Sequence, residues 1–342
     1  MDSSYIKMEI LEQCFENING SCSRTPRRFA EQTALYITLI LGDALCISGN
    51  LMVIISISYF KQLHSPTHFL VLSLAFADFL IGVLVLPFSI IRAVESCWYF
   101  GDTFCLFHSS VDAACSLSSI FHLCFISIER YFAVSNPLTY HLKFTTSVLN
   151  LLICLGWLLP ITYALAMPYS NTYADELQDF MAVLPCKGSC QMQFNNLWAV
   201  INLLIYLIPF SLMIGMYTNV FIIARRQARL IESIAGKTAT VKEYSSEVAK
   251  RERKAAKTLG IAVGAFTICW MPLMLDVTVD TIFNVTTPLT VYQTFFWIAY
   301  FNSSLNPLIY AFFFPWFRET VKLIVTCKII RFDYSDRNLF NE

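Results

Sequence analysis

Seven long apolar runs restrict what this chain of 342 residues can fold into. A helix needs about 20 apolar residues to cross a bilayer, and each run reaches that length. Backbone polar groups find no water in lipid, so such runs form helices and not open strands. The sequence therefore predicts an all-α, seven-transmembrane helix bundle, with spans near 34–60, 68–94, 102–135, 147–168, 196–224, 256–281 and 290–312.

The distribution of charge sets the orientation of the bundle. Only 14% of the residues are charged, whereas soluble domains have about 25%. Seven spans place the termini on opposite sides, and 18 of the 24 Lys and Arg residues lie on the C-terminal side. Because cytosolic loops are rich in Lys and Arg, the N-terminus is predicted to be extracellular. We expect an extracellular tail over 1–32, the bundle over 33–313, and an amphipathic eighth helix with a cytoplasmic tail over 314–342.

Several residues outside the spans are candidates for covalent modification. Asn19 and Asn284 lie in glycosylation sequons on the outer side. Cys327 at the end of the amphipathic segment is a candidate for palmitoylation. The outer compartment is oxidising, so disulfides are expected there, but spacing alone does not determine the pairs. The outer cysteines are Cys14, Cys22, Cys97, Cys105, Cys186 and Cys190.

Ionisable side chains within the spans are functional candidates, because inserting one costs at least ~2.5 kcal/mol. Asp112 lies in the outer part of the third span, and Arg130 follows 18 residues later. That spacing is five helical turns, so both share one face, roughly 27 Å apart. A carboxylate in an outward-opening pocket would bind a cation, and aromatic rings would add cation–π attraction. The candidate rings are Trp270, Trp297 and Tyr300.

A second polar set lies deeper in the bundle. Ser119 is two turns below Asp112 on the same face. With four more polar side chains it would line a small cavity suited to a sodium ion. Those four are Asp78, Asn302, Ser303 and Asn306. No other metal or cofactor is predicted.

The motifs resemble the rhodopsin-like G-protein-coupled receptors over all seven spans. In order they are Gly49-Asn50, Leu74-Ala-Phe-Ala-Asp78, Cys105, Glu129-Arg-Tyr131, Trp157, Pro209 with Tyr217, Cys269-Trp-Met-Pro272 and Asn306-Pro-Leu-Ile-Tyr310. A narrower pattern, which runs from Asn302-Ser through Tyr310 to Phe314-x-Trp-Phe317, looks like the fingerprint of the trace amine-associated receptors. Most members of that family are olfactory receptors for volatile amines.

The resemblance implies a multi-pass receptor of the plasma membrane that binds a small amine at Asp112. It implies coupling to a stimulatory or olfactory G protein that raises cyclic AMP. It also implies the disulfides Cys105–Cys190 and Cys22–Cys186. The implied ligand set is Asp112, Ser116, Asn202, Trp270, Leu273, Trp297 and Tyr300. The implied switch residues at the G-protein side are Glu129, Arg130, Tyr131, Tyr217, Glu252, Asn306, Pro307 and Tyr310. Arg130 is expected to form an ion pair with Glu252 that locks the resting state. Under the ligand, the implied repacking core is Ile120, Pro209 and Phe266.

Two departures from the family pattern restrict the ligand. Leu273 and Met274 stand where amine receptors usually carry aromatic residues, which favours an aliphatic or cyclic amine. Asn202 stands where diamine-sensing relatives have a second acid. This argues against a diamine, unless Asp276 or Asp280 substitutes.

Other classes fit the sequence less well. A serotonin or histamine receptor would share the fold and chemistry, but the fifth span lacks an outer cluster of serines. A transporter or channel would show repeated halves and broken helices. An opsin needs a lysine in the last span, which has none, and an enzyme needs a nucleophile–base pair, which is not seen. Membrane lipid is an expected partner, and nucleic acid is not.

Overall fold

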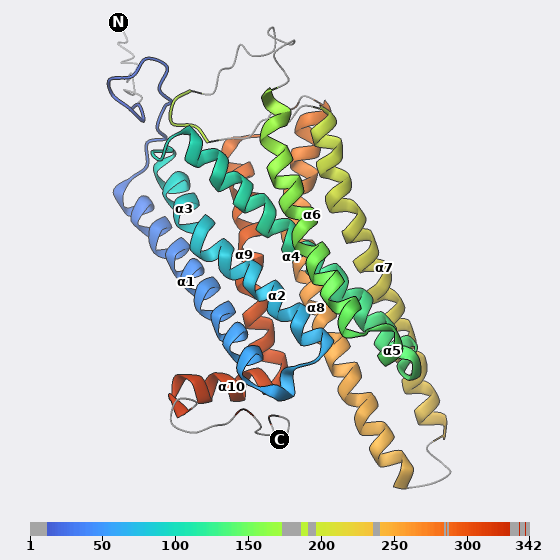
Figure 1. Ribbon diagram of the computed structural model, residues 1–342. Coiled ribbons are helices and arrows are strands. Elements are labelled where there is room, and N and C mark those ends of the chain that lie inside the picture. The colour runs from blue at the N-terminus through green and yellow to red at the C-terminus, as the bar shows by residue number, and fades with distance from the viewer. Residues whose placement is uncertain are drawn as a thin grey trace, which may run out of the picture.

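The computed structural model describes residues 12–172, 186–190, 196–234, 240–283, 285, 287–328, 335 and 339. Long helices stand side by side in one bundle, and a short helix lies across one end (Figure 1). The long helices are α1 (Phe29–Tyr59), α4 (Asp102–Ser135), α6 (Thr146–Thr172), α7 (Asn196–Ile234), α8 (Thr240–Phe283) and α9 (Leu289–Phe313). The shorter elements are η1 (Lys61–Leu63), α2 (Pro66–Leu80), η2 (Ile81–Val85), α3 (Leu86–Glu95), α5 (Pro137–Lys143) and α10 (Pro315–Val325).

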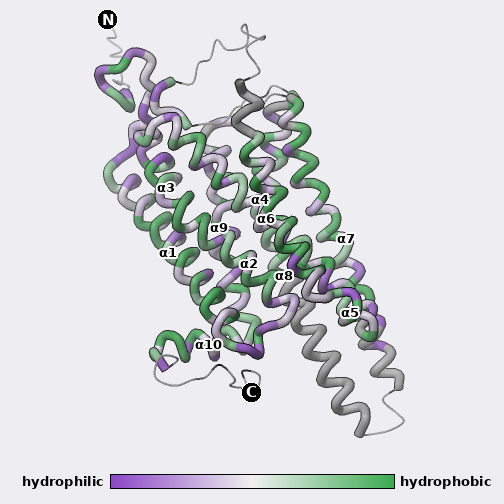
Figure 2. The backbone as a smooth tube through the Cα atoms, viewed as in Figure 1, coloured by the Kyte–Doolittle hydropathy of each residue, from purple (hydrophilic) through white to green (hydrophobic). Residues whose placement is uncertain are grey.

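Helix length and composition suit a bilayer. Within the described ranges, six segments are long and apolar enough to cross a membrane: Phe29–Tyr59, Pro66–Glu95, Asp102–Ser135, Thr146–Ala166, Val200–Ile223 and Gly260–Asp280. α9 has 25 residues and no charged side chain, and its Tyr, Asn and Ser residues lower its hydropathy. Hydrophobic residues predominate along the helices, and hydrophilic ones gather near the outer tail and the inner ends (Figure 2). This arrangement agrees with the predicted seven-helix bundle.

The second span is a continuous rod made of α2, η2 and α3. Pro87 lacks a backbone N–H, so it cannot complete a regular helical ladder with the preceding turn. The chain widens there into the π-turn η2, where the N–H of Leu86 donates to the carbonyl of Ile81. Such turns are frequent near functional sites. Here the turn brings the carbonyl of Val85 within 3.1 Å of Nε2 of His108 on α4.

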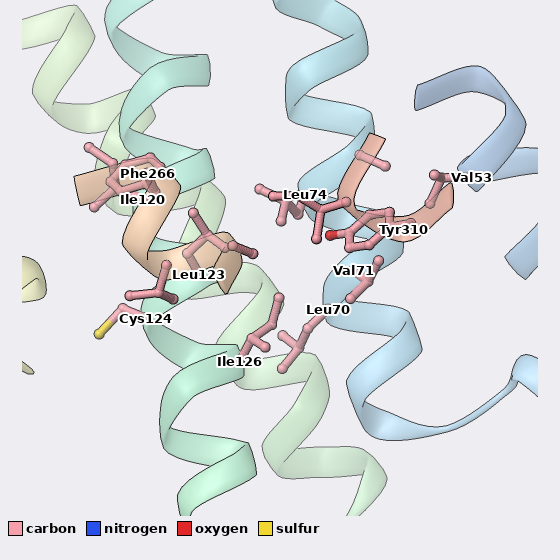
Figure 3. Close-up of a cluster of buried hydrophobic side chains, with 14 of the residues drawn as sticks. Val53, Leu70, Val71, Leu74, Ile120, Leu123, Cys124, Ile126, Phe266 and Tyr310 are labelled. Carbon is pink, nitrogen blue, oxygen red and sulfur yellow. The ribbon is translucent and has the colours of Figure 1, made fainter. Parts of the chain in front are cut away.

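The inner half of the bundle is packed around α4, which contacts α2, α6, α7 and α8. Side chains from α1, α2, α4, α8 and α9 converge there (Figure 3). Leu74, Ile120, Leu123, Phe266 and Tyr310 are each at most 2% exposed. In lipid such packing stabilises the bundle through van der Waals contact more than through removal from water.

The predicted amphipathic helix after the last span is α10. Its Trp316 and Phe317 are buried, and the ring of Trp316 meets the ring of His68 edge-on at 5.3 Å. Ser56 on α1 donates a hydrogen bond of 2.8 Å to Thr320. These contacts fix α10 across the inner ends of α1 and α9.

Three disulfide bonds join the outer segments: Cys14–Cys97, Cys22–Cys186 and Cys105–Cys190. The last two are the pairs that the resemblance implied, and the first was not predicted. The loop after α3 is also bonded to the second outer loop, because the N–H of Trp98 donates to the carbonyl of Gly188 at 2.8 Å. The tail, the first outer loop and the second outer loop thus form one covalently linked cap.

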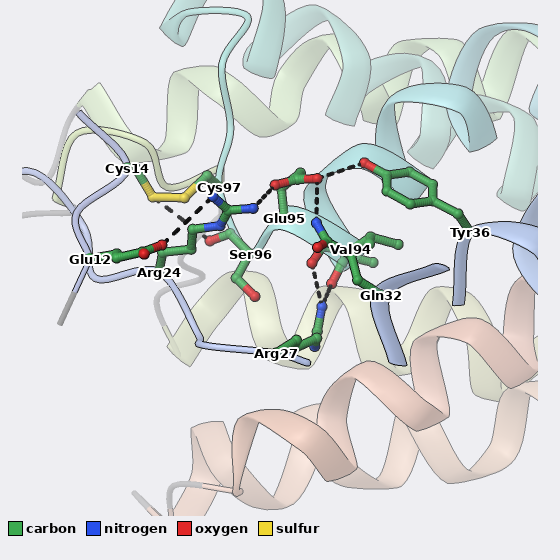
Figure 4. Close-up of polar contacts among 11 residues, drawn as sticks. Glu12, Cys14, Arg24, Arg27, Gln32, Tyr36, Val94, Glu95, Ser96 and Cys97 are labelled. Atoms are coloured by element: carbon green, nitrogen blue, oxygen red, sulfur yellow. Dashed lines mark hydrogen bonds and ion pairs between the residues drawn. A yellow bond between two sulfur atoms is a disulfide. The ribbon is translucent and has the colours of Figure 1, made fainter. Parts of the chain in front are cut away.

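Glu95, the last residue of α3, binds both the tail and the start of α1 (Figure 4). Its carboxylate pairs with Arg24 and accepts hydrogen bonds from Gln32 at 2.7 Å and Tyr36 at 2.9 Å. Arg27 donates to the carbonyls of Ala93 and Val94 at 2.5 and 2.6 Å. A cation at these last carbonyls also complements the negative end of the helix dipole. Polar contacts therefore hold the tail against α3 in addition to the disulfides.

Candidate functional site

Asp112 lies on α4, seven residues after the disulfide at Cys105, and its side chain is half-buried. Its Oδ2 accepts a 2.7 Å hydrogen bond from the Tyr300 hydroxyl on α9. Its Oδ1 accepts a 3.2 Å hydrogen bond from Ser116, one turn further along α4. Among the described residues no cation forms an ion pair with Asp112. A carboxylate held only by neutral donors in a bundle interior is a site for a positive charge.

Tyr300 is supported by a polar wall that the sequence analysis did not predict. The hydroxyl of Ser89 lies 3.5 Å from the Tyr300 hydroxyl and 3.3 Å from Nε2 of His108. His108 is one turn outward from Asp112 on α4, is 1% exposed, and contacts the Val85 carbonyl. The four-residue spacing to Asp112 was a usable signal for His108. Its contact with Ser89 and Val85 depends on the π-turn, which sequence spacing does not reveal.

Arg92, in the last turn of α3, completes the outer part of this wall. Its Nη1 donates a 2.8 Å hydrogen bond to the carbonyl of Cys190. Its guanidinium carbon lies 5.7 Å from the centre of the Phe296 ring, a cation–π distance. Phe296 in turn meets Tyr300 edge-on, with ring centres 4.7 Å apart. Arg92 is therefore a fixed positive charge on the same wall as the Asp112 anchor.

The predicted aromatic cage is only partly assembled around Asp112. Tyr300 contacts the carboxylate directly. Trp297 touches Tyr300 with ring centres 5.6 Å apart, but it packs behind it against Leu39 and Val94 of α1 and α3. Trp270 stacks on the rings of Phe266 and Tyr206 instead. The sequence named these rings as candidates, but it did not show which of them contacts Asp112.

The remaining predicted ligand residues lie on α7 and α8. Asn202 is half-buried, and its Oδ1 accepts a 3.1 Å hydrogen bond from Tyr163 on α6. Leu273 is 4% exposed and packs in the same cluster as Trp270. Tyr206, which the sequence analysis did not single out, stacks on Trp270 at 5.7 Å. Apart from the Asn202–Tyr163 pair, the residues named on this side of the site are aromatic or apolar.

The deeper polar set converges on Asp78, which is fully buried. Its Oδ1 accepts from Ser119 at 3.0 Å and Ser303 at 2.9 Å, and its Oδ2 accepts from Asn306 at 2.8 Å. Asn302 is 2% exposed, and among the described residues its Oδ1 and that of Asn306 have no hydrogen-bond partner. A carboxylate beside oxygens that lack donors fits a hard cation such as sodium.

Comparison with known proteins decides the family. Residues 49–310 match the model of the 7 transmembrane receptor (rhodopsin family). The chain is 51% identical to trace amine-associated receptor 7a of Mus musculus, over 97% of this chain and 93% of that protein. It is 48% identical to trace amine-associated receptor 6 of Homo sapiens, over 100% of this chain and 99% of that protein. The chain belongs to the trace amine-associated receptors. The predicted fold class, membrane location and absence of enzyme activity are confirmed with it.

At the inner end of the receptor, Glu129 and Arg130 form the predicted switch motif. The Arg130 side chain pairs with Glu129 at 2.5 Å and also donates to Thr67 on α2. Glu129 is fully buried and accepts hydrogen bonds from Thr67 at 3.0 Å and from Tyr140 on α5. Burial, together with the Glu129 carboxylate, raises the pKa of Tyr140, so this hydroxyl remains a donor at neutral pH. Glu252 belongs to α8, but its side chain lies outside the described part of the receptor.

The other predicted switch residues and the predicted repacking core lie on α4, α7, α8 and α9. Phe266 contacts Phe210 and Trp270, with ring centres 5.4 and 6.0 Å apart, and Ile120 is fully buried beside it. Pro209 lies inside α7 and Pro307 inside α9. A Cβ at Gly49 would lie 2.7 Å from Pro307, so α1 and α9 approach closely there. The last members are Tyr131, which packs edge-on against Phe132, Tyr217, whose hydroxyl is buried, and Tyr310, which is 2% exposed.

A chain of hydrogen bonds joins α6, α2 and α4 at His122, a fully buried residue of α4. Trp157 Nε1 donates to the Ser73 hydroxyl at 2.9 Å, and that hydroxyl lies 2.8 Å from Nε2 of His122. Nδ1 of His122 lies 2.7 Å from the carbonyl of Ser118. A neutral ring with its proton on Nδ1 satisfies every member of the chain. His122 is thus a satisfied structural group, not a ligand for the amine.

Of the two predicted glycosylation sites, Asn19 is exposed on the outer tail, as modification requires. Asn284 lies outside the described residues. Cys327, the predicted palmitoylation site, is exposed just beyond the end of α10. These modifications stay predictions.

Proposed function

We propose that this receptor recognises a small, volatile organic amine in olfaction and couples to a stimulatory or olfactory G protein that raises cyclic AMP. The observation that carries the proposal is the Asp112 carboxylate, which has two neutral donors and no contacting cation among the described residues. The relatives are named for trace amines, and an ammonium group would supply a positive partner for the Asp112 carboxylate.

An ammonium ion fits the hydrogen-bonding pattern around the anchor. It brings up to three N–H donors, and the Asp112 oxygens retain lone pairs beyond those used by Tyr300 and Ser116. Such charge-assisted bonds are roughly twice as strong as neutral ones. Apolar Leu273 and half-buried Met274 supply no polar partner for the rest of the ligand. The arrangement therefore favours a small aliphatic or cyclic amine over a polar aromatic one.

The decisive experiment is Asp112→Asn in cells that carry a cyclic AMP reporter. The amide keeps the shape of the side chain and an oxygen for Tyr300, but it removes the charge. Leaving a ligand cation without its partner typically costs about 2–5 kcal/mol, so the half-maximal amine concentration should rise roughly 30-fold or more. Asp102→Asn is the matched control, because this acid is exposed in the first turn of the same helix.

Surface expression of both variants is measured by labelling the extracellular tail. Asp102→Asn should respond like the parent receptor. An unchanged half-maximal concentration for Asp112→Asn would remove this residue as the anchor. Amine responses that reach the reporter through another G-protein class would refute the stimulatory coupling but not the amine site.

We also propose that the Asp78 set holds a sodium ion in the resting receptor. The support is the buried carboxylate beside Ser119, Ser303 and the two amide oxygens of Asn302 and Asn306. Replacing sodium by a large organic cation should then increase agonist affinity in membranes, and Asp78→Asn should abolish this sodium dependence. A dependence that survives in Asp78→Asn would place the ion elsewhere.

A further inference from the structure

Arg92 is a half-buried cation in the outer half of the site. Among the described residues no carboxylate lies within ion-pair distance of its guanidinium. Its contacts are the Cys190 carbonyl and the face of Phe296. One N–H bond leaves most of the five guanidinium donors available. A half-buried guanidinium held by a neutral carbonyl and a ring keeps its full positive charge to offer to a ligand.

The position of Arg92 relative to Asp112 follows from a continuous column of contacts. Arg92 covers Phe296, Phe296 meets Tyr300 edge-on, and the Tyr300 hydroxyl donates to Asp112. Phe296 and Tyr300 are four residues apart on α9, which is about 6 Å along the helix axis. The cation therefore stands roughly one to two helical turns outward from the anchor. An amine that is bound at Asp112 and extends outward would bring its other end toward this charge.

The backbone carbonyl that binds Arg92 belongs to a disulfide-bonded residue. The Cys190 carbonyl that accepts from Nη1 is tied by a disulfide to Cys105, seven residues before Asp112 on the same helix. The position of Arg92 is thus set by the same helix that carries the anchor. A charge that cannot move away from the ligand discriminates between ligands more sharply than one on a flexible side chain.

We propose that Arg92 is a specificity-determining residue that reads the far end of the bound amine. It accepts a neutral end or a hydrogen-bond acceptor such as a hydroxyl, and it rejects a second positive charge. The inference rests on the proposed amine site at Asp112. It adds a physical reason, independent of Asn202, for the receptor to exclude diamines.

Two further acids of the outer side lie on α8. Asp276 and Asp280 both accept from the hydroxyl of Thr287 at 2.8 Å. Neither forms an ion pair with Arg92 among the described residues. A diamine whose second ammonium turned toward these acids would escape repulsion, so a series of chain lengths is needed in the test.

The experiment compares three ligand series of three to eight carbons: monoamines, ω-amino alcohols and α,ω-diamines. All present the same ammonium to Asp112 and differ only at the far end. Cyclic AMP responses are measured for the parent receptor, Arg92→Gln, Arg92→Lys and Arg92→Glu. Arg28→Gln is the matched control, because Arg28 is an exposed outer cation with no side-chain capping bond at the start of α1.

In the parent receptor, diamines should be at least tenfold less potent than the amino alcohols and monoamines of equal length. This estimate comes from the repulsion between the second ammonium and Arg92 at an effective dielectric constant of about 20. Arg92→Gln should remove most of this gap, and Arg92→Glu should make the diamine the most potent of the three. Arg92→Lys and Arg28→Gln should keep the parental order. If Arg92 only supported the outer loop, its loss would weaken all three series equally.

The outcomes separate the inference from the proposed function. No response of the surface-expressed parent to any amine would refute the amine function and the inference with it. Equal potency of diamines and monoamines in the parent would overturn the inference alone, even if no Arg92 variant reached the surface. A potency order that stays parental in expressed Arg92→Gln and Arg92→Glu would also overturn it.

Discussion

Replacing Gly156 by alanine should break the hydrogen-bond chain through His122. A Cβ at position 156 would lie 2.7 Å from Cε1 and 3.0 Å from Nε2 of the His122 ring, so the ring has to move. The ring is fully buried and held by Ser118 and Ser73 at 2.7 and 2.8 Å. A shift therefore weakens both bonds.

The magnitude follows from three terms. Overpacking of a well-filled core costs about 1–3 kcal/mol. Two weakened buried hydrogen bonds add about 1 kcal/mol each. Alanine in place of glycine inside a helix returns about 1 kcal/mol. The net loss should be about 2–4 kcal/mol, which corresponds to a fall of roughly 5 °C or more in the midpoint of thermal inactivation.

The assay is the temperature at which half of the detergent-solubilised receptor loses its monodisperse peak. Gly215→Ala is the matched control, since no atom lies within 4 Å of the added methyl group on α7. This control should be unchanged or slightly stabilised. In a His122→Ala background the clash partner is gone, so Gly156→Ala should then cost little. Equal midpoints for Gly156→Ala and Gly215→Ala in the parent background would refute the packing argument.

Two further predictions concern the cap and the inner switch. Cys14→Ser, Cys97→Ser and the double variant each delete the same disulfide bond, so each should lower the midpoint of thermal inactivation by the same amount. The expected loss of stability is about 2–4 kcal/mol. Additive losses in the double variant would show that the two cysteines are not partners. Glu252→Ala should raise ligand-free cyclic AMP several-fold, because it removes the predicted ion pair with Arg130 from the inactive state. Such a partly exposed pair is worth up to about 1 kcal/mol, and the equilibrium between inactive and active receptor shifts by that difference. This rise should disappear when Arg130 is also neutralised. If Glu252→Ala shows the same basal signalling as the parent at matched surface expression, Glu252 is not the partner of Arg130.

The spans were predictable because hydropathy is a local property. The predicted span near 102–135 matches α4 at both ends. The sixth span was predicted near 256–281, whereas α8 already begins at Thr240. Asp112 and Asp78 were also identifiable, because an acid in lipid requires a function or a partner. The relation of Asp112 to Ser116, one turn further along α4, follows from helical periodicity alone, whereas the contact of Asp78 with Ser119 joins two helices.

The sequence by itself thus determined the bundle, its orientation, the candidate anchor and the family motifs, since each depends on composition or on spacing within one helix. Only the tertiary structure decided which groups meet across helices and loops. The bond between Cys14 and Cys97 depends on how the tail folds back over α3. The position of the Arg92 side chain depends on a loop carbonyl 98 residues away along the chain. No local pattern encodes such pairings, because they arise when distant segments pack together.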